Sequence, residues 1–159
     1  YQGIPVQSKS GHSFIKDKMR EHNAVYGGEM SAHHYFRDFS YCDSGMIPWL
    51  LVVSVLSETG QSLSSLVEEM ITKFPCSGEI NFKVADTQIT IQKLFDHFAN
   101  QNPSIDHTDG VSLDFGAWRF NVRASNTEPL LRLNIETRLD QHPKPMQDYV
   151  DELTRLIQN

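Results

Sequence analysis

A polar stretch between two apolar runs carries the side chains best suited to bind a phosphate group. It reads Arg123-Ala124-Ser125-Asn126-Thr127-Glu128-Pro129. Arginine offers a planar fork of N–H donors, serine and threonine offer hydroxyls, and asparagine offers an amide. The flanking runs alternate like strands. The sequence therefore predicts a phosphate-binding loop between two strands. The alternative is an ordinary polar hairpin loop with one solvated arginine.

A second polar stretch follows two glycines, Gly27 and Gly28, which allow a tight turn after a short apolar run. Glu29, Ser31 and His33 then alternate along the chain. In an extended segment all three would project to one side. A carboxylate, a hydroxyl and an imidazole on one edge can hold sugar hydroxyls. The alternative is a half-exposed polar loop.

Composition limits the class of the protein and its partners. The 159 residues are 39% hydrophobic and 21% charged, enough for the core of one domain, or of one and a half small ones. The net charge is −6, and no two Lys or Arg residues are adjacent. This charge argues against a nucleic-acid surface or an anionic-membrane binder. A phosphate site must therefore be a local concentration of positive charge.

Cysteine and histidine usage predicts a cytoplasmic protein without a zinc site. The only cysteines, Cys42 and Cys76, form no CxxC pair. The histidines are scattered, and none has zinc-site spacing. The longest apolar run, residues 46–56, contains Pro48 and is too short to span a bilayer. Because the chain starts without an initiator Met or a targeting pattern, it is expected to be a fragment.

Periodicity predicts two parts that meet near residues 73–76. The first part is expected to begin with a helix at 13–22, capped by His12 or Ser13, and short strands at 24–27 and from 35. A buried helix at 46–56 and a helix at 62–71, with a capping pair Ser65 and Glu68, follow.

The second part is expected to contain five strands, at 79–84, from 105, and at 111–115, 118–122 and 130–137. It also has a helix from Asp86 or Thr87 to about 101, and a helix after Pro145. Helices on one face of a mainly antiparallel sheet give an α+β fold.

Three motifs in this order resemble those of the bacterial α-D-phosphohexomutases, and most closely the phosphomannomutases. Lys9-Ser10-Gly11-His12 is similar to a Lys-Thr-Gly-His segment of that family's third domain. Gly28-Glu29-Met30-Ser31-Ala32-His33 is similar to its sugar-recognition loop, with Ala32 where many members carry Gly. Residues 123–129 are similar to the phosphate-binding loop of its fourth domain. Three ordered motifs over nearly the whole chain are more specific than any one of them.

The resemblance implies two domains. Residues 1–74 would be the C-terminal part of the family's third domain, a partial α/β domain with the sugar-recognition loop. Residues 75–159 would be the fourth domain, of the TATA-box-binding-protein-like type, with two helices on one face of an antiparallel sheet. That name describes a shape, and the charge of −6 gives no reason to expect DNA binding.

The resemblance also shows what the sequence lacks. The family's phosphoserine loop lies in its first domain, and its Mg²⁺-binding Asp-Gly-Asp-Gly-Asp loop lies in the second. Asp109-Gly110 is the only Asp-Gly pair here. The family transfers a phosphoryl group between C1 and C6 of a hexose through hexose 1,6-bisphosphate, with Mg²⁺. This chain is therefore expected to hold no catalytic residue and no metal ligand, and to be inactive alone.

The resemblance assigns phosphate binding to four residues of the first motif: Arg123, Ser125, Asn126 and Thr127. Arg132, among alternating apolar positions, is interpreted instead as a solvated strand residue.

For the sugar, the resemblance assigns the 3- and 4-hydroxyls to Glu29 and Ser31, and a nearby contact to sugar or phosphate to His33. Lys9 and His12 are additional candidates. The alternative for this pair is a solvated lysine and a helix cap.

The implied function is part of a phosphomannomutase, with a phosphosugar as substrate and no nucleic-acid or membrane partner. The alternatives are a phosphoglucomutase or other hexose-phosphate mutase, and a non-catalytic phosphosugar-binding module. Mannose and glucose share the hydroxyls that Glu29 would hold. A glucosamine mutase is disfavoured by Met30, where that branch tends to carry Gln. Self-association through the apolar helix near residues 43–56 is also expected, because part of the domain is missing.

Overall fold

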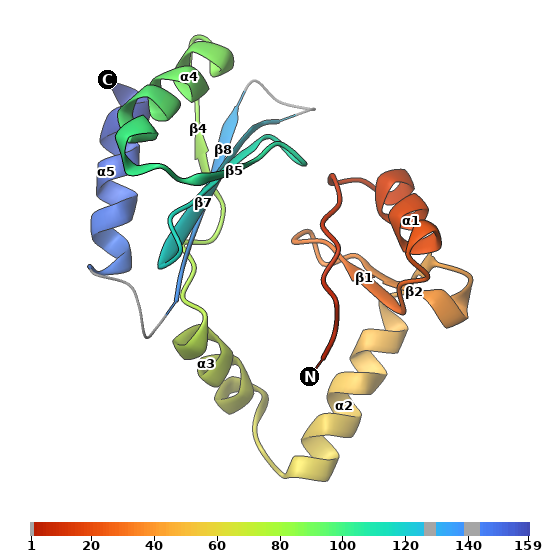
Figure 1. Cartoon of the computed structure of the whole chain (residues 1–159). Helices are drawn as coiled ribbons and strands as arrows, with labels where there is room; N and C mark the ends of the chain where they lie inside the picture. Colours follow the sequence, from red (N-terminus) through yellow and green to blue (C-terminus); the bar gives the residue numbers. More distant parts are fainter. Residues whose placement is uncertain (1, 126–129, 139–143) are drawn as a thin grey trace. The chain divides into compact units, whose positions relative to one another are not determined.

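The structure, a computed structural model, describes residues 2–125, 130–138 and 144–159. The chain forms two compact units, of which the first ends at Ser65 and the second begins at Leu66. Each unit has its own antiparallel sheet and its own buried core (Figure 1). The predicted α+β class is confirmed.

In the first unit a helix packs on a three-stranded sheet. The elements are α1 (His12–Glu21), β1 (Tyr26–Gly28), β2 (His34–Phe36), the 3-10 helix η1 (Arg37–Phe39), β3 (Cys42–Asp43) and α2 (Met46–Thr59). The strand order is β1-β2-β3, and Tyr35 pairs with Asp43. Ile15 and Met19 of α1 pack on the buried ring of Tyr35. This small core supports the hairpin between β1 and β2.

Two helix starts differ from the prediction. Gly11 is the N-cap of α1, so neither of the two predicted capping residues caps that helix. In α3 (Leu63–Lys73) the hydroxyl of Ser62 accepts the N–H of Ser65, so the predicted capping residue is one turn too late. At the start of α1, the N–H of the N-cap residue Gly11 donates to the side chain of Glu29. That partner is distant in sequence, and local capping rules do not reveal it.

Helices α2 and α3 have no buried residue. The side chains of Trp49 and Leu50 are more than half exposed. The prediction of a buried helix at 46–56 is therefore wrong for the described part of the chain. It follows from the rule that a helix with apolar residues on all sides is normally buried by other parts of a protein. Self-association through this face stays a prediction. Within the described ranges no single helix is long and apolar enough to cross a membrane. Only α2 and α3 taken together, as a bent pair, reach the required length and composition.

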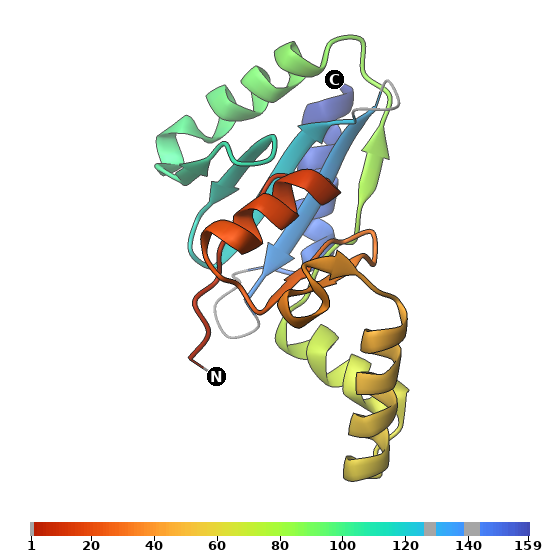
Figure 2. The ribbon, with the colours of Figure 1, turned by 90° about the vertical axis from the view of Figure 1, so that its right-hand side faces the viewer.

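In the second unit two helices cover one face of a five-stranded sheet (Figures 1 and 2). The elements are β4 (Ile80–Phe82), α4 (Thr87–Phe98), η2 (Ala99–Gln101), β5 (Ser104–Asp106), β6 (Val111–Asp114), β7 (Trp118–Ala124), β8 (Leu131–Thr137) and α5 (Met146–Gln158). The strand order is β4-β8-β7-β6-β5, with every pair antiparallel. Asp86 caps α4 through two backbone N–H groups.

The two long strands of this sheet separate a core face from a polar face. Every second residue is buried: Trp118, Phe120 and Val122 on β7, and Leu131, Leu133 and Ile135 on β8. These side chains form one cluster with residues of α4 and α5. The intervening positions, which include Arg123 and Arg132, therefore point to the face opposite the helices.

A turn before β6 brings Gly110 against the strand that carries Arg123. Gly110 has a φ of +73°, and a Cβ there would lie 2.4 Å from the carbonyl oxygen of Val122. We expect Gly110→Ala to lower the free energy of unfolding by about 2 kcal/mol or more, because a left-handed backbone and a backbone clash both oppose alanine. Gly116→Ala is the matched control: its φ is +84°, but a Cβ there would meet no heavy atom within 4 Å. Its cost should be about 1 kcal/mol. Equal losses in urea denaturation would contradict the close-packing argument.

Candidate functional site

The predicted sugar-binding residues lie on a hairpin turn between β1 and β2. The N–H of Glu29 donates to the carbonyl of His33 at 2.9 Å, and the N–H of Ala32 donates to the carbonyl of Glu29 at 3.1 Å. Ala32 has a φ of 64°. The segment is therefore a turn and is not extended, so the condition under which Glu29, Ser31 and His33 would share one side is not met, and the alternative of a polar loop describes it better. The turn sets Glu29 opposite His33 at its base and leaves Ser31 exposed.

Both oxygens of Glu29 are anchored within the first unit. Oε1 accepts the N–H of Gly11 at 2.8 Å, and Oε2 accepts the hydroxyl of Tyr35 at 2.8 Å. Burial, and then the hydrogen bond to Glu29, raises the pKa of Tyr35 above its ordinary value. A carboxylate at the N-terminus of α1 also favours that helix. Each oxygen keeps a second lone pair, so Glu29 is held in place and can still accept sugar hydroxyls.

His33 is oriented by a carboxylate from β3. Its Nδ1 lies 2.7 Å from Oδ2 of Asp43, whose Oδ1 accepts the backbone N–H of His34 at 2.9 Å. The hydrogen bonds from His33 and then His34 hold the pKa of Asp43 below its ordinary value. An ionised carboxylate can only accept, so Nδ1 is the donor, and Nε2 is the atom left for another partner. A ring fixed in this way can exchange a proton or accept a hydrogen bond from a sugar hydroxyl.

Of the two additional candidates, the structure brings only His12 to this cluster. The ring centroid of His12 lies 4.6 Å from that of His33 and 5.4 Å from that of Tyr35. Lys9 instead has its Nζ 5.2 Å from the ring centroid of Phe14. A ligand atom of each of His12, Glu29 and His33 lies within 4.8 Å of the others. The expectation of no zinc site rested on spacing along the sequence, and it stays a prediction, although the fold brings these three side chains together.

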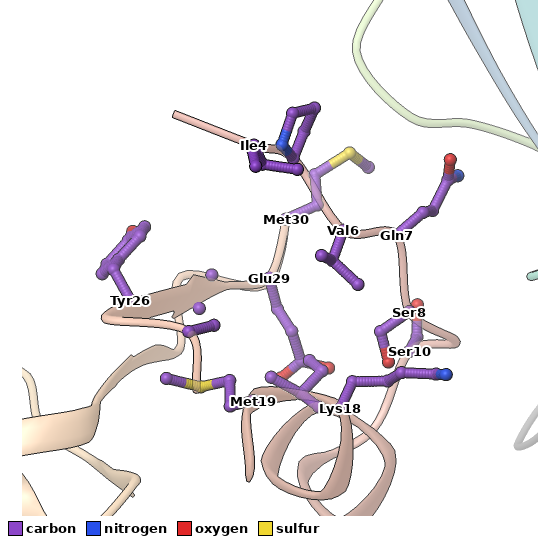
Figure 3. A pocket seen from close by; sticks show the side chains of 15 residues that line it. Ile4, Val6, Gln7, Ser8, Ser10, Lys18, Met19, Tyr26, Glu29 and Met30 are labelled. Atoms are coloured by element: carbon purple, nitrogen blue, oxygen red, sulfur yellow. The ribbon is translucent and has the colours of Figure 1, made fainter. Parts of the chain in front are cut away.

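A pocket of about 450 Å³ opens beside Glu29 in the first unit (Figure 3). Its walls are residues 4–8 and 10, α1 and β1, with Lys18 and Met30 among the lining side chains. This volume is ordinary for a small-molecule pocket. Of the predicted sugar-binding residues, Glu29 alone lines it. The pocket therefore gives access to the Glu29 side of the cluster.

The described part of the predicted phosphate loop, residues 123–125, lies beside a second arginine on the neighbouring strand. Arg123 of β7 is the cross-strand partner of Arg132 of β8. Their guanidiniums share the carboxylate of Glu79, with N–O distances of 3.4 Å for Arg123 and 3.3 Å for Arg132. Arg132 also donates to the hydroxyl of Ser125 at 3.3 Å. The other two predicted phosphate ligands, Asn126 and Thr127, lie outside the described residues.

This arrangement changes the interpretation of both arginines. Arg132 is not a solvated strand residue, because its side chain is 24% exposed and contacts both Glu79 and Ser125. Arg123 is paired, so an incoming phosphate must share or displace Glu79. Among the described residues, the two guanidiniums share one carboxylate in a chain whose net charge is −6. A partly buried cluster of this kind attracts an anion more strongly than fully solvated side chains do.

Sequence reasoning missed several of these contacts. Arg132 could have been found by pairing the two strands symmetrically about the loop, because that register sets it opposite Arg123. Asp43 gives no local signal, since its contact with His33 depends on the pairing of β2 with β3. Glu79 likewise reaches the arginines from the segment that leads into β4, the neighbour of β8.

Comparison with known proteins places both units in one family. The model for the phosphoglucomutase/phosphomannomutase α/β/α domain III matches residues 1–74, and the model for the C-terminal domain of the same family matches residues 79–153. In Xanthomonas campestris pv. campestris (strain B100), a protein described as "Phosphohexose mutases" is 65% identical over 138 residues, 87% of this chain and 31% of that protein.

Two phosphomannomutases are also similar. That of Vibrio cholerae serotype O1 is 55% identical over 156 residues, 98% of this chain and 33% of that protein. That of Escherichia coli (strain K12) is 55% identical over 138 residues, 87% of this chain and 30% of that protein. The chain thus spans about a third of the length of these relatives.

A crystal structure of a phosphoglucomutase/phosphomannomutase family protein from Burkholderia thailandensis matches with a TM-score of 0.71 and 24% identity, over 98% of this chain and 32% of that one. This likeness supports the fold alone. Because two models of one family together match nearly all of the sequence, the resemblance seen in its motifs is confirmed. The chain belongs to the phosphoglucomutase/phosphomannomutase family.

Proposed function

We propose that this chain provides the sugar and phosphate recognition elements of a phosphomannomutase, which interconverts mannose 6-phosphate and mannose 1-phosphate. The observation that carries the proposal is the 55% identity to the phosphomannomutase of Vibrio cholerae over 156 residues, an alignment long enough to include both polar motifs. The anchored carboxylate of Glu29 and the two arginines beside Ser125 support it.

In this proposal the phosphoryl group passes from a phosphoserine in another part of the protein to the free hydroxyl of the hexose phosphate. The resulting hexose 1,6-bisphosphate reorients, and its other phosphate returns to the serine. Arg123 and Ser125, with Asn126 and Thr127, bind the phosphate that is not reacting. Arg132 joins them through its contact with Ser125. Such positioning of the substrate is a large part of catalysis in phosphoryl transfer.

Glu29 holds two neighbouring sugar hydroxyls in both orientations of the bisphosphate. Its carboxylate cannot rotate freely, because Gly11 and Tyr35 each hold one oxygen. His33 presents Nε2 as an acceptor to a sugar hydroxyl, or as a donor to a phosphate oxygen when the ring is protonated, since Asp43 occupies Nδ1. Ser31 and His12 would complete the contacts from the tip and the base of the hairpin. The chain's own residues thus bind and orient the substrate.

Mg²⁺ supplies charge neutralisation for phosphoryl transfer when it is bound. The His12, Glu29 and His33 group does not suit it, since Mg²⁺ prefers six oxygen ligands and this group has two imidazoles. We therefore propose that residues outside this chain hold Mg²⁺. The chain by itself is proposed to be inactive.

Steady-state kinetics of a full-length protein that contains this chain test the proposal. With hexose 1,6-bisphosphate and Mg²⁺ present, we expect turnover of mannose 6-phosphate with kcat/KM at least equal to that for glucose 6-phosphate. The 159-residue chain should show no turnover. A clear preference for glucose 6-phosphate would identify a phosphoglucomutase instead. Turnover of neither sugar would favour a non-catalytic phosphosugar-binding module.

A further inference from the structure

We propose that His12, Glu29 and His33 form a binding site for a divalent transition-metal ion, best suited to Zn²⁺, at the base of the β1–β2 hairpin. One ligand atom of each side chain lies within 4.8 Å of the others. Two imidazoles and one carboxylate are a known three-ligand zinc set, with water in the fourth position. Imidazole nitrogen favours zinc over magnesium, so the site is different in kind from a Mg²⁺ site.

The surrounding hydrogen bonds have the arrangement of an outer shell around metal ligands. Asp43 binds Nδ1 of His33 at 2.7 Å, which fixes the ring and leaves Nε2 for a metal. Gly11 and Tyr35 each donate to one oxygen of Glu29 at 2.8 Å. Each of these oxygens has a second lone pair for a metal. Two of the three ligands are therefore held in place before any ion arrives.

The third ligand, His12, can move its ring toward the other two ligands, as metal binding requires. In a tetrahedral zinc site with Zn–N near 2.0–2.1 Å, the donor atoms lie about 3.3 Å apart. The present atoms must therefore close from as much as 4.8 Å. His12 is exposed and begins α1, so its ring can turn by a change of rotamer. The carboxylates of Glu29 and Asp43 add negative charge that attracts a cation.

A metal bound here would occupy Glu29, the residue to which the proposed function assigns the sugar hydroxyls. Metal and sugar would then compete for one carboxylate. This consequence rests on the proposed function, whereas metal binding itself does not. A binding measurement on this chain without any sugar therefore tests the metal site separately.

The test is calorimetric titration of this chain with ZnCl₂, with Co²⁺ absorption as a probe of geometry. Both exposed cysteines should first be replaced by serine, since thiolates bind zinc. We expect one ion per chain and the absorption bands of four-coordinate Co²⁺. His12→Ala should weaken Zn²⁺ binding by about tenfold or more, and its exposed position keeps the variant folded. Asp43→Asn should weaken binding by about tenfold without removing a ligand.

His34→Ala is the matched control, because this neighbouring ring bonds the hydroxyl of Tyr26 at 2.7 Å and is outside the three-residue group. Its Zn²⁺ affinity should stay close to that of the parent chain. Three results would overturn the proposal: no Zn²⁺ binding by the parent chain, unchanged binding by His12→Ala, or an equal loss in His34→Ala. Mutase kinetics do not enter this test, so its failure would leave the proposed function standing.

Discussion

Replacing Glu29 by glutamine in a full-length protein that contains this chain should lower kcat/KM for the sugar phosphate by about 100-fold. The carboxylate is proposed to accept two sugar hydroxyls, and each hydrogen bond to a charged group contributes about 1.5–3 kcal/mol. Glutamine also places an NH₂ group where an oxygen now accepts either the N–H of Gly11 or the hydroxyl of Tyr35. Steady-state kinetics with either hexose phosphate measure the loss.

Tyr35→Phe separates sugar binding from support of the hairpin. It removes one anchor of Glu29 and keeps the carboxylate. We expect a smaller loss in kcat/KM, about tenfold, and a fall of about 1 kcal/mol in the free energy of unfolding for the missing hydrogen bond. If Tyr35→Phe is as damaging as Glu29→Gln, the effect comes from loss of local structure, and the sugar-binding role of Glu29 fails.

Arg123→Ala should have the next largest effect, a fall of about 30-fold or more in kcat/KM with a raised KM. The variant loses a charge-assisted contact with phosphate, which contributes about 2 kcal/mol or more. Ser125→Ala removes a neutral hydroxyl and should cost about 1 kcal/mol, or about fivefold. Arg132 remains in both variants and keeps part of the positive charge.

Arg119→Ala is the control for Arg123→Ala, since it removes the same kind of side chain from the same strand. Arg119 lies on the same face of β7, where it bonds Glu136 at 2.8 Å. Its replacement should leave kcat/KM within about twofold, as expected for an exposed ion pair. Equal losses for the two arginines, or no loss for Arg123→Ala, would contradict a phosphate site at the end of β7.

The second unit was predictable from sequence because its elements carry their own signals. β7 and β8 alternate apolar and polar residues, as a sheet with one buried face requires. Asp86 stands directly before an amphipathic helix and caps it. Asp109-Gly110 marks the turn before β6. Both the face that carries Arg123 and the order of elements follow from these patterns.

The candidate site was less predictable because its geometry depends on contacts between distant segments. The alternation of Glu29, Ser31 and His33 looks like a strand, and only the pairing of β1 with β2 shows that it spans a turn. The same pairing brings His33 across from Glu29, and α1 then adds His12. The exposure of α2 could not be predicted either. An apolar run indicates that a helix is stable when other residues bury it, but it does not show whether those residues are in the same chain.

A crystal structure of a full-length protein that contains this chain, with mannose 1-phosphate bound, tests the central claim most directly. The claim is that Glu29 binds the sugar and Arg123 binds a phosphate. We predict that the Glu29 carboxylate lies about 2.7 Å from two sugar hydroxyls, and the Arg123 guanidinium about 2.8 Å from phosphate oxygens. A well-ordered ligand that touches neither residue, with Arg123 bound only to Glu79, would contradict the claim.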